Sequence, residues 1–181
     1  MKLNILILCL LLIITIASCK KNQTSQNTNQ LPPATQTGAN TFGCYINGSL
    51  FVPQGYKNPF PNYELTVDSG ASGDFSIHTY KIINGVKSDF GINGANVYNA
   101  GNFPISSSTT VFPFYFRDAN SNDCWFTTGV SIPNYRSGYL KITRYDLANG
   151  IFSGEFEMNL YDSTISCDTI RITQGRFDKK L

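Results

Sequence analysis

Residues 151–161, IFSGEFEMNLY, carry the clearest alternation of apolar and polar side chains in the chain. One set of alternate positions is apolar or small and the other is polar: Phe152, Gly154, Phe156, Met158 and Leu160 against Ser153, Glu155, Glu157 and Asn159. Successive side chains of a β-strand point to opposite faces of the sheet, so a period of two predicts a strand with one buried face. The segments YLKITRY and DTIRITQGRF follow the same rule. In the second of them Phe177 falls out of phase, which predicts a bulge at Gly175.

Similar runs of Tyr, Phe, Ile, Val and Thr recur between turn residues, and they predict strands throughout the domain. The expected strands are 42–52 (a small hairpin), 63–69, 74–83, 87–92, 109–118, 123–128, 138–145, 151–161 and 168–177, with residues 93–108 as a Gly/Asn/Ser-rich loop. Asn-Gly pairs suit two-residue hairpin turns because both residues tolerate positive φ. They occur at Asn47-Gly48, Asn84-Gly85, Asn93-Gly94 and Asn149-Gly150. We therefore predict an all-β fold, a single antiparallel β-sandwich or barrel-like meander of about 8–10 strands.

The first residues of the chain are apolar but too few to form a transmembrane helix. Residues 3–17 follow Lys2, and a helix of that length reaches about 22 Å, short of the roughly 30 Å hydrocarbon core. A basic start, a short apolar core and small residues at the exit predict a secretory signal peptide over residues 1–18. The exit, Ile16-Ala17-Ser18-Cys19, resembles the lipobox of bacterial lipoproteins, where signal peptidase cuts before a lipidated cysteine. We predict a lipid anchor on Cys19; the alternative is a plain signal peptide with a chance cysteine.

The segment after Cys19 differs in composition from the rest of the chain. Residues 20–41 contain no acidic and no aromatic residue, and few apolar ones. Such a composition buries too little surface to offset the entropy lost on ordering. We therefore expect a disordered tether over residues 19–41, reaching at most about 75 Å when straight, and one β domain over residues 42–181.

Charge gives no sign of a nucleic-acid partner. The chain has 14 Lys and Arg against 12 Asp and Glu, and Lys2, Lys20 and Lys21 precede the domain. The charges of the domain itself therefore nearly balance, and no basic patch is indicated.

No catalytic, metal or cofactor site is indicated by the sequence. His78 is the sole histidine and lies midway along an expected strand, with no Gly-x-Ser-x-Gly motif elsewhere. Residues 118–125, DANSNDCW, lack the glycine and glutamate that an EF-hand calcium loop requires, so a polar hairpin loop is the better interpretation. A glycosidase pair of carboxylates is an alternative among Glu64, Glu155 and Glu157. Glu155 and Glu157, however, are expected on one solvent face, which is ordinary for a half-exposed strand. We therefore expect a protein that is not an enzyme and that needs no cofactor.

Three cysteines remain in the domain, Cys44, Cys124 and Cys167, and they allow one bridge with one thiol left over. Cys124 and Cys167 each open an expected strand, where backbones can adjust to the separation that a bridge requires. Cys44 lies within a strand, where a small buried thiol packs well. We predict a Cys124–Cys167 disulfide.

The two ends of the domain carry recognisable motifs: the opening NTFGCYINGSLFVP and, near the end, GYLKITRYDLANGIFSGEFEMNLYDSTISCDTIRITQGRFD. These segments resemble a family of Bacteroidota lipoproteins that carry a domain of unknown function. The resemblance implies an anchored β domain with no assigned activity, and its glycines are explained as turns and bulges. Asp162-Ser163-Thr164 also resembles the Asp-Ser/Thr-apolar acceptor used for O-glycosylation in that bacterial group, with Ser163 as the acceptor.

Two functions fit these observations. The first is a non-enzymatic outer-membrane lipoprotein of the cell envelope, a binding or accessory module for a protein or glycan, with the periplasmic face favoured because Lys20 and Lys21 follow the anchor. The second is a small-ligand or glycan-binding β-barrel of lipocalin type. An envelope hydrolase is a third class, whose residues are lacking. Aromatic residues near loops are candidates for stacking on sugars, or are ordinary strand-surface residues: Tyr45, Tyr56, Phe60, Tyr63 and Tyr98.

Overall fold

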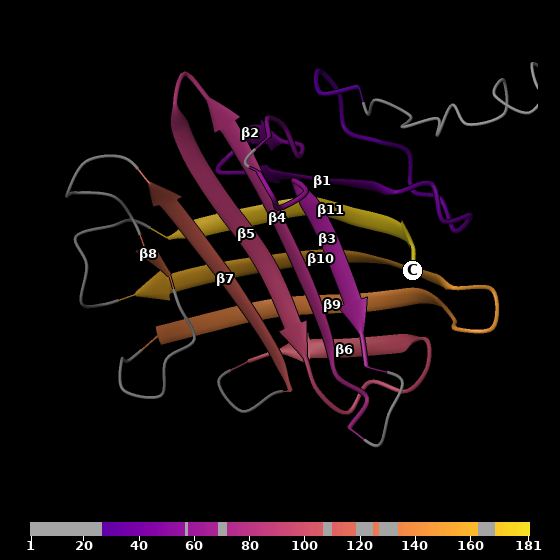
Figure 1. Ribbon diagram of the computed structural model, residues 1–181. Helices are drawn as coiled ribbons and strands as arrows, with labels where there is room; N and C mark the ends of the chain where they lie inside the picture. The colour runs from indigo at the N-terminus through magenta and orange to yellow at the C-terminus, as the bar shows by residue number, and fades with distance from the viewer. Residues whose placement is uncertain are drawn as a thin grey trace, which may run out of the picture.

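The computed structural model describes residues 27–56, 58–68, 72–106, 110–118, 125–126, 134–162 and 169–181. These residues form two antiparallel sheets that pack face to face (Figure 1). The described part contains strands and no helix, and hence none long and apolar enough to cross a membrane. The predicted all-β fold is confirmed, and of the two expected architectures it is the sandwich. The two sheets do not close into a barrel, and the described strands number eleven rather than 8–10.

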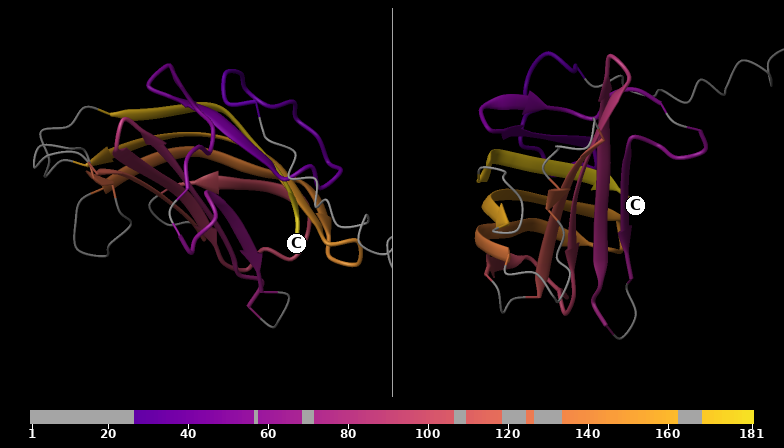
Figure 2. Two further views of the ribbon diagram at one scale, coloured as in Figure 1. Left: turned by 45° about the horizontal axis from the view of Figure 1, so that its top comes forward. Right: turned by 90° about the vertical axis from the view of Figure 1, so that its left-hand side faces the viewer.

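Sheet A has six strands in the order β2-β1-β11-β10-β9-β6, and sheet B has five in the order β3-β4-β5-β7-β8. Sheet A consists of β1 (Thr41–Ile46), β2 (Ser49–Phe51), β6 (Gly101–Ile105), β9 (Asn134–Asp146), β10 (Ile151–Asp162) and β11 (Ile170–Lys180). Sheet B consists of β3 (Tyr63–Val67), β4 (Phe75–Ile83), β5 (Val86–Gly94), β7 (Val111–Asp118) and β8 (Trp125–Phe126). Figure 2 shows sheet A curving over sheet B, with the strands of the two sheets crossing at a steep angle.

Two of the four Asn-Gly pairs form the predicted two-residue turns. Asn47-Gly48 joins β1 to β2 and Asn84-Gly85 joins β4 to β5, each with positive φ at both residues. Asn149-Gly150 belongs instead to a four-residue connection between β9 and β10. The prediction for Asn93-Gly94 was wrong, because both residues lie within β5 and pair with β4 and β7.

The expected loop at residues 93–108 contains a strand that the pattern did not reveal. Strand β6 lies at the edge of sheet A and pairs only with β9, through Phe103 opposite Leu140. Pro104 lies in this strand. An edge strand tolerates proline because one of its sides needs no backbone N–H donor.

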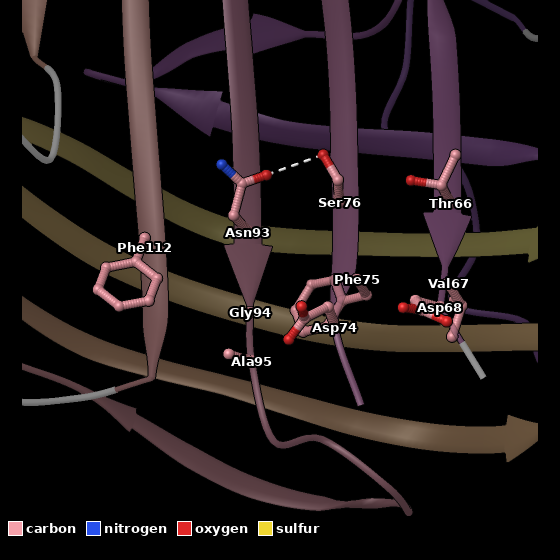
Figure 3. Close-up of a pocket in the computed structure, with 10 residues that line it drawn as sticks. All are labelled: Thr66, Val67, Asp68, Asp74, Phe75, Ser76, Asn93, Gly94, Ala95 and Phe112. Carbon is pink, nitrogen blue, oxygen red and sulfur yellow. Dashed lines mark hydrogen bonds between the residues drawn. The ribbon is translucent and has the colours of Figure 1, made fainter. Parts of the chain in front are cut away.

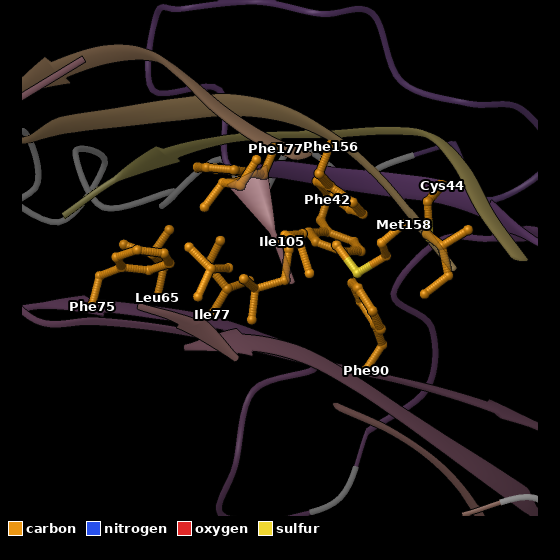
Figure 4. Packing of buried hydrophobic residues seen from close by; sticks show 14 of the residues in the cluster. Phe42, Cys44, Leu65, Phe75, Ile77, Phe90, Ile105, Phe156, Met158 and Phe177 are labelled. Carbon is orange, nitrogen blue, oxygen red and sulfur yellow. The ribbon is translucent and has the colours of Figure 1, made fainter. Parts of the chain in front are cut away.

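The core lies between the two sheets and is rich in phenylalanine (Figure 4). The ring centroid of Phe42 lies 5.6 Å from that of Phe156 and 5.8 Å from that of Phe90, so β1, β10 and β5 meet at one point. The inward positions predicted for the last three strands are buried as expected: Leu140, Ile142, Phe152, Phe156, Met158, Leu160, Ile170, Ile172 and Phe177.

Four glycines lie opposite phenylalanines on neighbouring strands. The cross-strand pairs are Gly175 with Phe156, Gly154 with Phe177, Gly94 with Phe75, and Gly91 with Phe114. A Cβ atom on any of these glycines would come within 2.1–2.7 Å of the facing ring. Each ring therefore lies over the backbone of the glycine opposite, which no other residue type would permit.

The bulge predicted at Gly175 is present one residue earlier. Phe156 pairs with Gly175 and Met158 pairs with Ile172, so a step of two residues in β10 corresponds to a step of three in β11. Gln174, in this step of β11, has a φ of +52°. The extra residue restores the phase, so that Phe177 points inward with Ile172. Gly175 itself is required by the Phe156 ring rather than by backbone conformation.

Residues 31–40, called here the strap, lie against the outer face of sheet A, although a disordered tether was expected up to residue 41. The Asp178 carboxylate accepts hydrogen bonds from the backbone N–H groups of Thr37 (3.0 Å), Gly38 (2.8 Å) and Ala39 (3.0 Å). The Thr35 hydroxyl donates to the same carboxylate at 2.7 Å. The folded unit therefore begins upstream of the expected boundary at Phe42, because a buried acceptor on β11 compensates for the low apolar content of this segment.

Candidate functional site

The outer face of sheet B carries two rows of side chains that run across its strands. In the first row Thr66, Ser76, Asn93 and Phe112 are successive cross-strand partners on β3, β4, β5 and β7. In the second row the partners are Glu64, His78, Gly91 and Phe114. These eight residues are called here the sheet B face. Polar side chains lie over β3 to β5, and the two phenylalanines lie side by side on β7.

A shallow groove of about 520 Å³ follows the first row (Figure 3). The Ser76 hydroxyl donates to the Asn93 side-chain oxygen at 2.8 Å in the middle of the groove. Asp68 and Asp74 lie at the end where β3 and β4 are connected. The groove therefore offers uncharged hydrogen-bonding groups along its floor and carboxylates at one end.

Both phenylalanine rings of the sheet B face are held in place by neighbours. The Phe114 ring lies over Gly91, where a Cβ atom would meet it at 2.2 Å, and its centroid is 6.0 Å from that of the His78 ring. The Phe112 ring has the guanidinium carbon of Arg136 5.1 Å from its centroid. Both rings are half-buried, so each keeps part of its surface open to solvent.

His78 belongs to an ion-pair cluster beside the second row. Its Nε2 lies 3.0 Å from Oδ1 of Asp89, and Lys87 donates to the same oxygen at 2.5 Å. Burial works to raise the pKa of Asp89, but the hydrogen bonds from His78 and Lys87 outweigh it and hold that pKa below its ordinary value. Asp89 is therefore a buried anion with two partners, and His78 is half-exposed and hydrogen-bonded.

This cluster does not form a nucleophilic triad with Ser76, the serine on its strand. Ser76 lies two residues before His78 on the same face, and its hydroxyl donates to Asn93 instead. Within the described ranges, no group of three His, Cys, Asp or Glu side chains is arranged to hold a metal ion. In this structure Ser76 and His78 therefore do not form a nucleophile–base pair.

Most residues that the sequence singled out lie outside the described ranges. These are Cys19, the proposed lipidation site, the Cys124–Cys167 pair, and Ser163, the proposed glycosylation site. Cys44 is described: it is fully buried with a free thiol, as expected, and burial raises its pKa.

The candidate aromatic residues near loops separate into exposed and buried ones. The exposed fractions of Tyr56, Phe60 and Tyr98 are 72%, 61% and 52%, whereas Tyr63 is buried in the core. None of these three exposed rings lines the groove. Sequence reasoning missed Phe112 and Phe114, although their spacing of two within a strand would place them on one face.

Comparisons of the chain with protein-family models, with curated proteins and with solved structures gave no match. The motif residues that carry the lipoprotein resemblance have folding roles in the structure. Gly175 admits the Phe156 ring, Phe177 fills the core, and Asp178 holds the strap. Arg176 lies between them on the outer face and donates to the carbonyl of Pro32 at 3.3 Å. The C-terminal motif GRFD is therefore explained without an active site.

Proposed function

We propose that the protein is a lipid-anchored binding module of the bacterial cell envelope, without enzymatic activity, whose sheet B face binds a glycan. The anchor is supported by the lipobox at residues 16–19 and by the resemblance of the domain ends to envelope lipoproteins. The proposal that the partner is a glycan is supported by the side chains of the sheet B face.

The observation that carries the glycan proposal is the juxtaposition of rings and uncharged polar groups on one open face. The apolar faces of sugar rings stack on aromatic side chains, and their hydroxyls need donors and acceptors at fixed positions. Phe112 and Phe114 supply the rings, and Thr66, Ser76 and Asn93 supply the polar groups one strand spacing apart. A protein partner would be favoured instead by a contiguous apolar patch.

The lipocalin-type alternative requires a closed barrel around a lumen, whereas this domain is a sandwich with its core filled by side chains. A ligand of the sandwich must therefore bind on a face or at an end.

If Cys19 carries the anchor, the strap shortens the tether between the membrane and the folded unit. Because residues 31–40 are fastened to sheet A, only residues 20–30, eleven in number, separate the proposed anchor at Cys19 from the folded unit. That stretch reaches at most about 40 Å, roughly half the reach expected for a tether running to residue 41. A domain held this close to the bilayer suits a glycan partner that also lies close to the bilayer.

Replacing Phe112 or Asn93 with alanine is expected to weaken glycan binding about tenfold, because each change removes one of the two kinds of contact. Isothermal titration calorimetry against a panel of purified envelope polysaccharides measures the effect. Tyr139→Ala is the matched control, because Tyr139 is an exposed aromatic residue on sheet A, 41% exposed. Equal losses in Tyr139→Ala, or no binding by the unmodified domain, would contradict the glycan proposal and leave the anchor untouched.

Cys19→Ala is expected to abolish membrane association, since the acyl chains attach through this sulfur and a multi-chain anchor is effectively permanent. Fractionation of cells followed by a carbonate wash measures the distribution; the wild-type protein should stay in the outer-membrane pellet. A variant that still pellets would refute the anchor. Protease treatment of intact cells tests the periplasmic orientation, because removal of the domain would place it on the cell surface.

A further inference from the structure

A second hollow lies at one end of the sandwich, between the β1–β2 hairpin and the β4–β5 hairpin. It is a cleft of about 540 Å³, within the range of small-molecule sites. Sheet A contributes Ile46, Leu50 and Phe51 to its wall, and sheet B contributes Ile83, Val86 and Tyr115. The cleft is therefore lined mainly by apolar side chains from both sheets, unlike the polar groove on the sheet B face.

Among the described residues that line this cleft, Lys81 is the one that carries a charge. Its ammonium group donates to the Leu50 carbonyl at 2.6 Å, its one hydrogen bond within the described ranges, which leaves two of its three hydrogens for another acceptor. In the described part of the chain no carboxylate forms an ion pair with Lys81. Burial lowers the pKa of Lys81 from its ordinary value, so the ammonium has lost part of its hydration without gaining an anion.

The position of Lys81 along the hairpin fixes the direction of a bound molecule. Ile83 and Val86 are paired next to the Asn84-Gly85 turn, and Lys81 and Ser88 form a pair two residues further into the sheet. The cation and the Ser88 hydroxyl therefore lie at the inner part of the cleft, and the apolar side chains of the hairpin end lie nearer its mouth.

We propose that this cleft binds a single-chain amphiphile with a carboxylate head group, the head on Lys81 and Ser88 and the alkyl chain along Ile83, Val86 and Leu50. Charge complementarity selects the head group, because an anion next to a partly dehydrated ammonium gains more Coulomb energy than it would in water. The apolar wall selects the chain, because burying its methylenes is favourable in proportion to the area removed from water. This site is separate from the sheet B face, and either proposal can fail alone.

The test compares three probes of equal chain length: dodecanoate and dodecyltrimethylammonium below their critical micelle concentrations, and dodecan-1-ol below its solubility limit. Calorimetry on the folded domain with its strap is expected to show dodecanoate binding at least tenfold tighter than the alcohol, and no binding of the cation. Dodecyl phosphate, as a second anion, separates a requirement for carboxylate from one for any anionic head. Equal affinities for dodecanoate and dodecan-1-ol would overturn the proposal.

Two variants locate the site. Lys81→Gln should weaken dodecanoate binding at least tenfold and leave dodecan-1-ol unchanged, whereas Lys141→Gln, at an exposed position on sheet A, should change neither. Ile83→Ser, at a side chain that is 46% exposed and adds little to the core, should weaken both probes severalfold. Lys81→Gln and Ile83→Ser test the site independently, so a folding defect in one variant leaves the binding result of the other valid. Unchanged dodecanoate affinity in a folded variant of either kind would refute the assignment of the site.

Discussion

The Gly175→Ala variant is expected to lose about 3 kcal/mol of unfolding free energy, near the upper end of what added volume costs in a packed core. Glycine-to-alanine changes usually stabilise a protein slightly where the backbone conformation permits alanine. Gly175 has no positive φ, so the backbone would accept alanine. The penalty arises because the new Cβ atom would lie 2.2 Å from the Phe156 ring.

The Phe156 ring has no room to move away from that contact. It is fully buried, with its centroid 5.6 Å from the rings of both Phe42 and Phe90. Displacing it would disturb the point where the two sheets meet, so the strain reaches beyond one strand pair.

Urea unfolding measures this effect, with Gly101→Ala as the matched control. Gly101 also lies in a strand of sheet A, but a Cβ atom there would meet nothing closer than 3.8 Å. Its unfolding free energy should change by no more than about 0.5 kcal/mol. In the double variant Gly175→Ala/Phe156→Leu the loss of unfolding free energy should be smaller than the sum of the losses in the two single variants, because the smaller leucine side chain leaves room for the new Cβ atom. Additive losses would show that the ring is not the cause.

The Asp178→Asn variant is expected to release the strap and to cost about 3 kcal/mol, because an amide nitrogen cannot accept from the donors that converge on this position. Asp178 is 1% exposed. Besides the strap donors, the Ser153 hydroxyl donates to it at 2.7 Å. Hydrogen exchange should report the change at the backbone N–H groups of Thr37, Gly38 and Ala39, which exchange slowly only while bonded to the carboxylate.

Asp74→Asn is the control for this variant, since Asp74 is an exposed carboxylate in the connection between β3 and β4. It should leave both the unfolding free energy and the exchange of the strap unchanged. Slow exchange at residues 37–39 in Asp178→Asn would contradict the role given to the carboxylate.

Acid should reproduce part of this effect in the unmodified protein. Burial works to raise the pKa of Asp178, but the hydrogen bonds from Ala39, Ser153, Thr35 and Thr37 outweigh it and hold the pKa at about 2, below the ordinary 3.8. Because the folded-state pKa is the lower one, the stabilisation is fully present above about pH 4 and is lost as the pH falls toward 2. A shift of this size corresponds to roughly 2 kcal/mol. The difference in unfolding free energy between wild type and Asp178→Asn should shrink by that amount across this window.

Local patterns identified most strands, but not the segments held by distant partners. The alternation in residues 151–161 predicted β10 and its buried face correctly. In a strand with one face in the core, the alternation of apolar and polar residues itself shows which side chains are buried. Strand β6 was missed because Gly101 and Pro104 argue against a strand unless the edge position next to β9 is known. Asn93-Gly94 has the sequence of a turn, yet the Phe75 ring on the neighbouring strand makes glycine necessary there.

The sequence alone indicates the candidate sites even less clearly than it indicates the strands. Thr66, Ser76, Asn93 and Phe112 are far apart in the chain, and only the register of four strands brings them into one row. Lys81 has the sequence context of an ordinary strand lysine, and its cleft exists only because hairpins from two sheets enclose it. Asp178 belongs to the motif GRFD, but its partners on the strap lie about 140 residues away, as the 141-residue separation of Thr37 shows.

The sequence by itself determined the all-β class, the faces of the long strands, the two short turns and the anchoring hypothesis for Cys19. Each of these depends on neighbours within a few residues: alternation, positive φ at Asn-Gly, or a linear motif that an enzyme reads in an extended segment. Tertiary structure alone decided the sandwich over the barrel, the strap, the polar row beside two phenylalanines and the position of the Lys81 cation in the end cleft. These depend on which strands pair and in what register, a choice made by burial of the whole core rather than by any single segment.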